Sequence, residues 1–241
     1  MTTSGTTAFD LNLTEICEEA FERAGGELRS GYELRTARRS LSIMFSDWAN
    51  RGLNMFTMDS GSITLSQGIA TYDLPLDTVD LLEHVIRTNA GNTTTQSDLT
   101  ISRISVSTYA TIPNKLTQGR PIQVYVNRLS GATYPSPITP SPAYPTITVW
   151  PVPDDSQTYT FTYWRLRRIE DAGTGTSTFD VPFRFMPALT AGLAFYIAAK
   201  IPEGQMRLPF LKVEYEEAWQ LAAGEDREKA PVRFTPRVSY I

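Results

Sequence analysis

A nearly continuous apolar stretch at residues 186–201 constrains the fold of this chain more than any other feature. Its centre, residues 188–199, carries no charged side chain, so a helix formed here must be covered on most sides rather than along one stripe. Lys200 and Pro202 follow at once, which leaves the stretch well short of the roughly 20 apolar residues needed to cross a bilayer. The stretch therefore predicts a buried core helix that other segments must cover.

Three amphipathic segments are candidates for that role. Asn12 followed by Glu15 is typical of a capping box and predicts a helix over residues 13–24, which Gly25 ends. Helical periodicity predicts a second helix over about residues 32–51 and a last one over about residues 208–223. Because two of these helices lie far upstream of the core helix, both ends of the chain must meet to bury it.

Residues 54–180 have a different sequence pattern, with short β-like runs broken by Gly, Pro, Asp and Ser. Asp59-Ser60-Gly61 is typical of a hairpin turn. The clearest strand covers residues 157–167, where Tyr159, Phe161 and Tyr163 recur with a period of two. This period predicts that the aromatic face is the core of a sheet, and the alternative is a platform for sugars or bases.

The order of the elements predicts an α+β fold. We expect a helical bundle from the N- and C-terminal helices, with a β-rich domain inserted between them and an extended C-terminal arm. In this arrangement Leu189, Leu193 and Tyr196 are buried against Leu41 and Trp48. The predicted parts are helical residues 1–53, β-rich residues 54–180, helical residues 181–226 and the arm, residues 227–241.

The net charge, the cysteine count and the N-terminal composition argue against several classes of protein. A net charge of −4 does not favour tight, sequence-specific binding of DNA or RNA. The single cysteine, Cys17, excludes an internal disulfide and a multi-cysteine metal site. Residues 1–7 have neither a basic start nor an apolar run, so we expect no signal peptide and no association with a membrane.

Catalytic signatures are also missing from the sequence. It contains no glycine-rich phosphate loop, nucleophile elbow or zinc spacing, and we expect neither a cofactor nor a bound metal. Cys17 lies on an apolar stripe, and His84 is the only histidine. The pairs Asp154-Asp155 and Glu170-Asp171 leave a cell-wall hydrolase as the weakest alternative, because adjacent loop carboxylates do not fix the separation of roughly 5–9.5 Å that glycoside hydrolysis needs. We therefore predict that the chain is not an enzyme.

Arg35, Arg38 and Arg39 lie three and four residues apart on the second predicted helix and form one basic patch. The patch has three interpretations: a solvated face, a partner for the glutamates of the first helix in the same or a neighbouring subunit, or a contact with nucleic acid. The acidic balance of the chain argues against nucleic acid. Exposed ion pairs contribute only about 0–1 kcal/mol each, so they set orientation more than stability.

Two segments have the composition of contact regions rather than of a core. Residues 131–145 are rich in proline, which favours an extended excursion towards a neighbouring protein or a ligand for an aromatic groove. Residues 232–241 mix arginine with apolar residues, which is typical of an arm that orders on a partner. The alternative for this last segment is a frayed end.

The order of several short motifs is more informative than any one of them. The motifs are the helix from Arg35 to Trp48 followed by Ala49-Asn50-Arg51-Gly52-Leu53, then Tyr72-Asp73-Leu74-Pro75, Gly119-Arg120-Pro121, Trp150-Pro151-Val152-Pro153-Asp154 and Asp180-Val181-Pro182. In this order, over about residues 10–225, they resemble the head-to-tail adaptor proteins of tailed phages, in particular the tail tubular protein A family of short-tailed phages. The proline-rich segment 131–145 is longer than that family usually carries.

The resemblance implies a structural virion protein of the tail or neck, assembled in the host cytoplasm. In that family about twelve copies form a ring around the DNA passage, with the helical part beneath the portal protein and the β lobe facing the tail nozzle protein. The C-terminal arm reaches into the portal, and its candidate anchors here are Phe234, Arg237 and Tyr240, because aromatic and arginine side chains dominate interface energetics. The candidates for the subunit interface are Arg35, Arg38 and Arg39 with Glu15, Glu19 and Glu22.

A ring of chains that each carry a net charge of −4 would repel DNA and let it slide without sequence-specific binding. One alternative keeps the β domain as a binding module for a tail fibre or a surface glycan, through the aromatic residues of 159–164. Burial of those rings would contradict this alternative.

Overall fold

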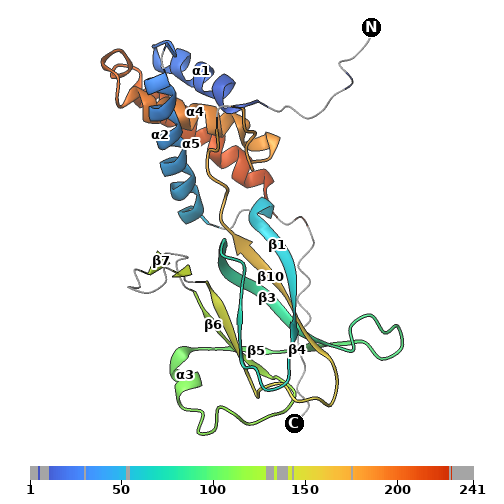
Figure 1. The fold of residues 1–241 in the computed structure, drawn as a ribbon. Coiled ribbons are helices and arrows are strands. Elements are labelled where there is room, and N and C mark those ends of the chain that lie inside the picture. The colour runs from blue at the N-terminus through green and yellow to red at the C-terminus, as the bar shows by residue number, and fades with distance from the viewer. Residues whose placement is uncertain are drawn as a thin grey trace, which may run out of the picture. The chain divides into compact units, whose positions relative to one another are not determined.

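The computed structural model describes residues 5, 11–29, 31–52, 55–128, 133–134, 141–142, 144–174, 176–227 and 229. The chain divides into two compact units. Residues 1–56 and 169–241 form the first, which contains the long helices and is called the helical unit here, and residues 57–168 form the β unit (Figure 1). The predicted α+β fold, with a β-rich region between terminal helices, is confirmed.

The first helix begins and ends as its sequence predicts. In α1 (Leu13–Ala24) the Asn12 side chain accepts a hydrogen bond from the Glu15 backbone N–H at 3.0 Å, and the Glu15 carboxylate accepts one from the Asn12 N–H at 2.9 Å. Gly25 follows with a φ of 93°, a conformation that suits glycine and satisfies the last carbonyl groups of the helix.

Three further long helices complete the helical unit. They are α2 (Gly31–Asn50), α4 (Met186–Ala198) and α5 (Leu208–Glu225). Short 3-10 helices connect them to the rest of the chain: η1 (Met55–Thr57), η2 (Phe183–Phe185) and η3 (Pro202–Gly204). No helix in the described part of the chain is both long enough and apolar enough to cross a membrane.

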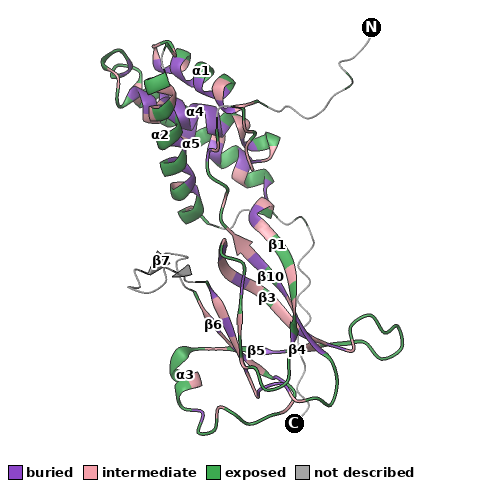
Figure 2. Cartoon of the chain, viewed as in Figure 1, coloured by how far each residue is buried: buried purple, intermediate pink, exposed green. Residues whose placement is uncertain are grey.

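The apolar helix α4 lies at the centre of this unit and packs against α1, α2 and α5 (Figures 1 and 2). Leu189 and Leu193 are fully buried in one hydrophobic cluster with Leu41 and Trp48, as predicted. Tyr196 differs from the prediction, because it is only half-buried at the edge of the cluster. Residues from both ends of the chain therefore share one core.

The β unit contains two four-stranded sheets. One has the order β1-β10-β3-β4 and is antiparallel throughout; the other has the order β2-β9-β6-β5, in which β5 and β6 are parallel. The first sheet is built from β1 (Met58–Leu65), β3 (Thr78–Thr88), β4 (Ser97–Thr100) and β10 (Tyr159–Arg167). The second is built from β2 (Thr71–Asp73), β5 (Ser102–Ile104), β6 (Gln123–Asn127) and β9 (Thr146–Trp150), and the short helix α3 (Val106–Ala110) follows β5.

Both sheets contribute to one apolar core, which includes Val124 and Ile147 from the second sheet. Tyr159, Phe161 and Tyr163 of β10 are 1 %, 0 % and 3 % exposed within it. The aromatic face is thus sheet core, as predicted. These buried rings contradict the alternative of a glycan-binding platform made by this aromatic face, whereas Trp164, on the other face of β10, is 43 % exposed.

The predicted hairpin turn at Asp59-Ser60-Gly61 is wrong. Strand β1 runs through these residues without a break and pairs with β10, so that Gly61 lies opposite Tyr163. A Cβ atom on Gly61 would lie 2.5 Å from the Tyr163 hydroxyl oxygen. This glycine serves the close approach of an aromatic ring to a strand rather than a turn.

The proline-rich segment is described only in part. Its strands β7 (Thr133–Tyr134) and β8 (Ser141–Pro142) pair in an antiparallel two-stranded sheet. The other predictions for residues 131–145 concern residues outside the described ranges, except 144–145.

Candidate protein interface

One side of α2 is basic, exposed and hollowed. Its side chains line a hollow of about 570 Å³ in the structure. Among them, the apolar side chains of Tyr32 and Ile43 expose 66 % and 58 % of their surface beside the arginines. We call this surface the basic face, and it consists of Tyr32, Arg35, Arg38, Arg39, Ser42 and Ile43.

The arginines of the basic face lack acidic partners within the described part of the chain. Arg39 donates a hydrogen bond to the Thr36 hydroxyl at 3.2 Å, and no ion pair joins Arg35, Arg38 or Arg39 to a described carboxylate. The positive charge also acts on Lys200, whose pKa is lowered by burial and by the charge of Arg39. The Lys200 ammonium donates to the Ser40 hydroxyl at 2.6 Å. The pairing of this patch with glutamates of the same subunit, one of the predicted alternatives, is therefore absent from the described residues.

The outer side of α1 carries the opposite charge. Glu15, Glu18, Glu19 and Glu22 are all exposed. Two of them have partners within the chain: Glu15 closes the capping box, and Glu19 accepts a hydrogen bond from Arg23 at 2.7 Å. Among the described residues the carboxylates of Glu18 and Glu22 have no partner. The acidic side chains therefore form an exposed surface that is neutralised only in part, by the Arg23 partner of Glu19.

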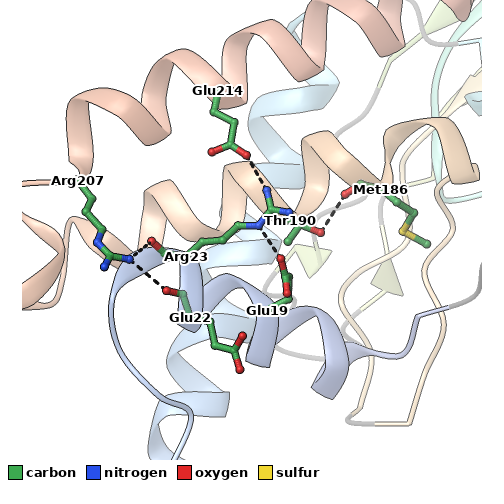
Figure 3. A network of polar contacts seen from close by, with 7 residues as sticks. All are labelled: Glu19, Glu22, Arg23, Met186, Thr190, Arg207 and Glu214. Carbon is green, nitrogen blue, oxygen red and sulfur yellow. Dashed lines mark hydrogen bonds and ion pairs between the residues drawn. The ribbon is translucent and has the colours of Figure 1, made fainter.

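Helix α5 is attached to α1 by polar contacts that fix their relative position (Figure 3). Arg23 reaches from α1 to Glu214 at 2.6 Å. From the start of α5, Arg207 donates to the backbone carbonyls of Glu22 and Arg23 at 3.3 and 3.0 Å, which satisfies the end of α1. These contacts place the first turns of α5 beside the C-terminal end of α1.

Phe210 lies between Arg207 and Glu214 on the same side of α5, and it is 78 % exposed. Val213, three residues after Phe210 and therefore one turn along the helix, is 57 % exposed. Helical periodicity over residues 208–223 indicates one buried side of α5, and Phe210 and Val213 are apolar residues outside it. We call the exposed carboxylate side of α1 the acidic face, and it consists of Glu15, Glu18, Glu19 and Glu22.

Helices α2 and α5 are also joined by a clamp, which is buried at Trp48 and Tyr215 and half-buried at Arg51 and Glu216. The Trp48 indole N–H donates to the Tyr215 hydroxyl at 2.8 Å. Arg51 makes two hydrogen bonds to Glu216, at 2.9 and 3.0 Å, and its guanidinium lies 4.8 Å from the centre of the Tyr215 ring. Because such bidentate and stacked arginines are geometrically specific, α2 and α5 hold one orientation. The sequence pattern gave no sign of this clamp.

The C-terminal arm lies almost wholly outside the described residues, and so do its candidate anchors Phe234, Arg237 and Tyr240. The structure does show where the arm begins. The buried carboxylate of Asp226 accepts a hydrogen bond from the Met55 backbone N–H at 2.7 Å and lies 3.7 Å from Arg184. The chain therefore leaves α5 from a fixed point of the helical unit.

The surroundings of Cys17 and Asp154 shift the pKa of each side chain away from the value that catalysis would need. Burial raises the pKa of the Cys17 thiol to about 12, so the reactive thiolate is scarce at neutral pH. Hydrogen bonds from Ser156 and Tyr159 hold the pKa of Asp154 below its usual value, whereas a general acid needs a raised one. Across the described ranges, no three His, Cys, Asp or Glu side chains form a group able to hold a metal ion.

Comparison with models of protein families gives a match that covers both units of the chain. A family model described as SU10 adaptor protein matches residues 14–236, from α1 through the β unit to a point beyond the end of α5. The match identifies the class as phage adaptor proteins, which are structural proteins. The chain belongs to the SU10 adaptor family. The motifs thus indicated the correct class, whereas the match does not support the narrower tail tubular protein A family. A comparison with curated protein sequences gives no match.

Proposed function

We propose that the chain is a head-to-tail adaptor that forms a ring between the portal protein and the tail nozzle protein. The observation that carries this proposal is the family match over residues 14–236, on a chain whose helical unit exposes two faces of opposite charge. A closed ring of identical subunits, here about twelve, needs two different complementary surfaces on each subunit. The ring would occupy the neck of the virion after assembly in the host cytoplasm.

Each part of the chain has a role in this proposal. The helical unit docks beneath the portal, the β unit faces the tail nozzle, and residues 227–241 form an arm that enters the portal. Phe234, Arg237 and Tyr240 are its anchors, because aromatic and arginine side chains supply most of the binding energy of interfaces. The family match extends to residue 236, so it includes part of this arm.

The charge of the chain suits a passage for DNA. Each copy carries a net charge of −4, and a ring of such copies repels the phosphate backbone. DNA would therefore pass through the ring without being held or read. The arginines of the basic face would not hold DNA in this ring, because they would contact a neighbouring subunit.

Deletion of residues 228–241 tests the arm. We expect the shortened chain to stay folded as a monomer, because α5 and its anchor at Asp226 are retained, and to lose attachment to purified portal particles. Co-sedimentation with portal measures attachment, and circular dichroism with a thermal melt measures folding.

Deletion of residues 1–9 is the matched control, because it removes a terminal segment that the proposal gives no role. That variant should attach as the full chain does. Attachment by the chain lacking residues 228–241 at the level of the full chain would refute the arm. Failure of the full chain to bind any portal particle would refute the adaptor position itself.

A further inference from the structure

The two charged faces of the helical unit are complementary in chemistry. Within the described part of the chain, Arg35 and Arg38 of one face and the carboxylates of Glu18 and Glu22 of the other have no partner. We propose that the basic face of one copy binds the acidic face of the next copy, so that α2 of each subunit meets α1 and α5 of its neighbour. This inference rests on the proposed ring and names the surfaces that build it. The partner is a second copy of this chain.

Charge is the first argument. The basic face presents Arg35, Arg38 and Arg39 with no described carboxylate nearby, and the acidic face presents the unpaired carboxylates of Glu18 and Glu22. Arginine binds carboxylates in a bidentate geometry, which fixes register as well as attraction. A pairing of two identical faces would instead bring like charges together, which costs free energy. The charges therefore favour contact between different faces.

The exposed apolar residues are the second argument. The basic face has Tyr32 and Ile43 beside a hollow of about 570 Å³, and α5, which contacts α1 through Arg207 and Glu214, exposes Phe210 and Val213. Phe210 is 78 % exposed, so a contact that covers it gains hydrophobic free energy. Interfaces commonly have such an apolar centre within a polar rim. We assign the hollow on α2 to the Phe210 side chain of the next copy.

Rigidity is the third argument. Arg207 and the Arg23–Glu214 pair fix α5 against α1, and the Arg51–Glu216 pair fixes α2 against α5. The two faces therefore keep a constant angle within one subunit. Because the two faces keep a constant angle, each contact rotates the next subunit by the same amount. Repeated contacts close into a ring when this rotation divides a full turn.

Charge reversal with rescue by mixing tests this interface. One variant carries Arg35→Glu with Arg38→Glu, and the other carries Glu18→Lys with Glu22→Lys; these positions have no described partner, so folding should not change. We expect each variant alone to associate at least about tenfold more weakly than wild type, since like charges then meet. An equimolar mixture restores association, because each variant offers the complement of the other. Sedimentation velocity, alone and on portal particles, measures assembly.

Lys212→Glu is the matched control, since Lys212 is exposed on α5 outside both faces, and it should assemble as wild type does. Assembly of the reversed variants at wild-type strength, or no rescue in the mixture, would overturn this interface while leaving the arm deletion test valid. Wild type that stays monomeric both at high concentration and on portal would also overturn it. Wild-type assembly with loss of duplex DNA binding in the arginine variant would reassign the basic face to nucleic acid.

Phe210→Ala tests the apolar contact separately. We expect about tenfold weaker association with an unchanged melting temperature, because the side chain is exposed in the monomer. Leu116→Ala removes a side chain of equal exposure (79 %) in the β unit and should change neither quantity. Unchanged assembly of Phe210→Ala would remove the hollow on α2 as its binding site.

Discussion

At the scale of single residues, burial decides the chemistry of groups that sequence alone leaves open. Cys17 and His84 have side chains that often take part in catalysis. Cys17 is buried, and so are the ring nitrogens of His84. His84 lies on β3 with both ring nitrogens buried, and its ring stacks on Phe161 at 5.9 Å between centroids. Burial lowers its pKa, the nearby charge of Arg103 lowers it further, and Glu83 opposes this in part. His84 is thus a half-buried residue packed on Phe161, in a site that favours its neutral form.

The lowered pKa of His84 makes the stability of the β unit depend on pH. As pH falls below about 6.5, the unfolded chain binds a proton at this histidine before the folded chain does, so the free energy of unfolding decreases. The decrease ends once the pH is below the pKa in the folded state. We expect His84→Phe, which keeps the ring but cannot titrate, to lose less stability than wild type between pH 7.5 and 5.5. Thermal melts across that range measure the difference, and equal pH slopes would contradict it.

At the scale of elements, the helical unit depends on close approach of its helices. Gly192 of α4 lies where α2 and α5 meet it: a Cβ atom there would lie 2.5 Å from the Met44 sulfur and 2.7 Å from the Tyr215 ring. The ring cannot easily move, because the Trp48 indole holds its hydroxyl. The helix propensity of glycine is poor, yet packing requires it at this position.

Gly192→Ala should therefore destabilise the protein by about 1–3 kcal/mol through overpacking, even though alanine favours the helix by about 1 kcal/mol. Gly224→Ala is the matched control, because Gly224 is an exposed residue of α5 with open space around it. That substitution should be neutral or stabilise by up to about 1 kcal/mol. Urea denaturation measures both. A stabilising Gly192→Ala would show that α2 and α5 yield at this crossing.

At the scale of the whole molecule, the described residues form two hydrophobic cores that have none of these residues in common. One contains α4 and its covering helices, and the other contains the inner faces of the two sheets. Each unit therefore has its own source of stability. A phage adaptor with this organisation can keep its assembly surfaces on one unit while the other makes separate contacts.

Core substitutions should reveal this division. We expect Leu193→Ala to destabilise the helical unit by about 2–5 kcal/mol and Phe161→Ala to destabilise the β unit by about 3–5 kcal/mol, because each removes a fully buried side chain. Hydrogen exchange followed by mass spectrometry should show faster exchange mainly in the unit that carries the substitution. Equal acceleration in both units by either variant would mean that they unfold together.

The sequence by itself determined the helices, the fold class and the class of protein. The capping box at Asn12, the all-round apolar pattern of α4 and the period of two in β10 are local signals with a local physical cause. Only the tertiary structure decided that Gly61 lies in a strand, that Arg51 joins Glu216, and that Phe210 is exposed on α5. These features depend on residues far apart in the chain, and periodicity along one segment carries no information about what packs against it.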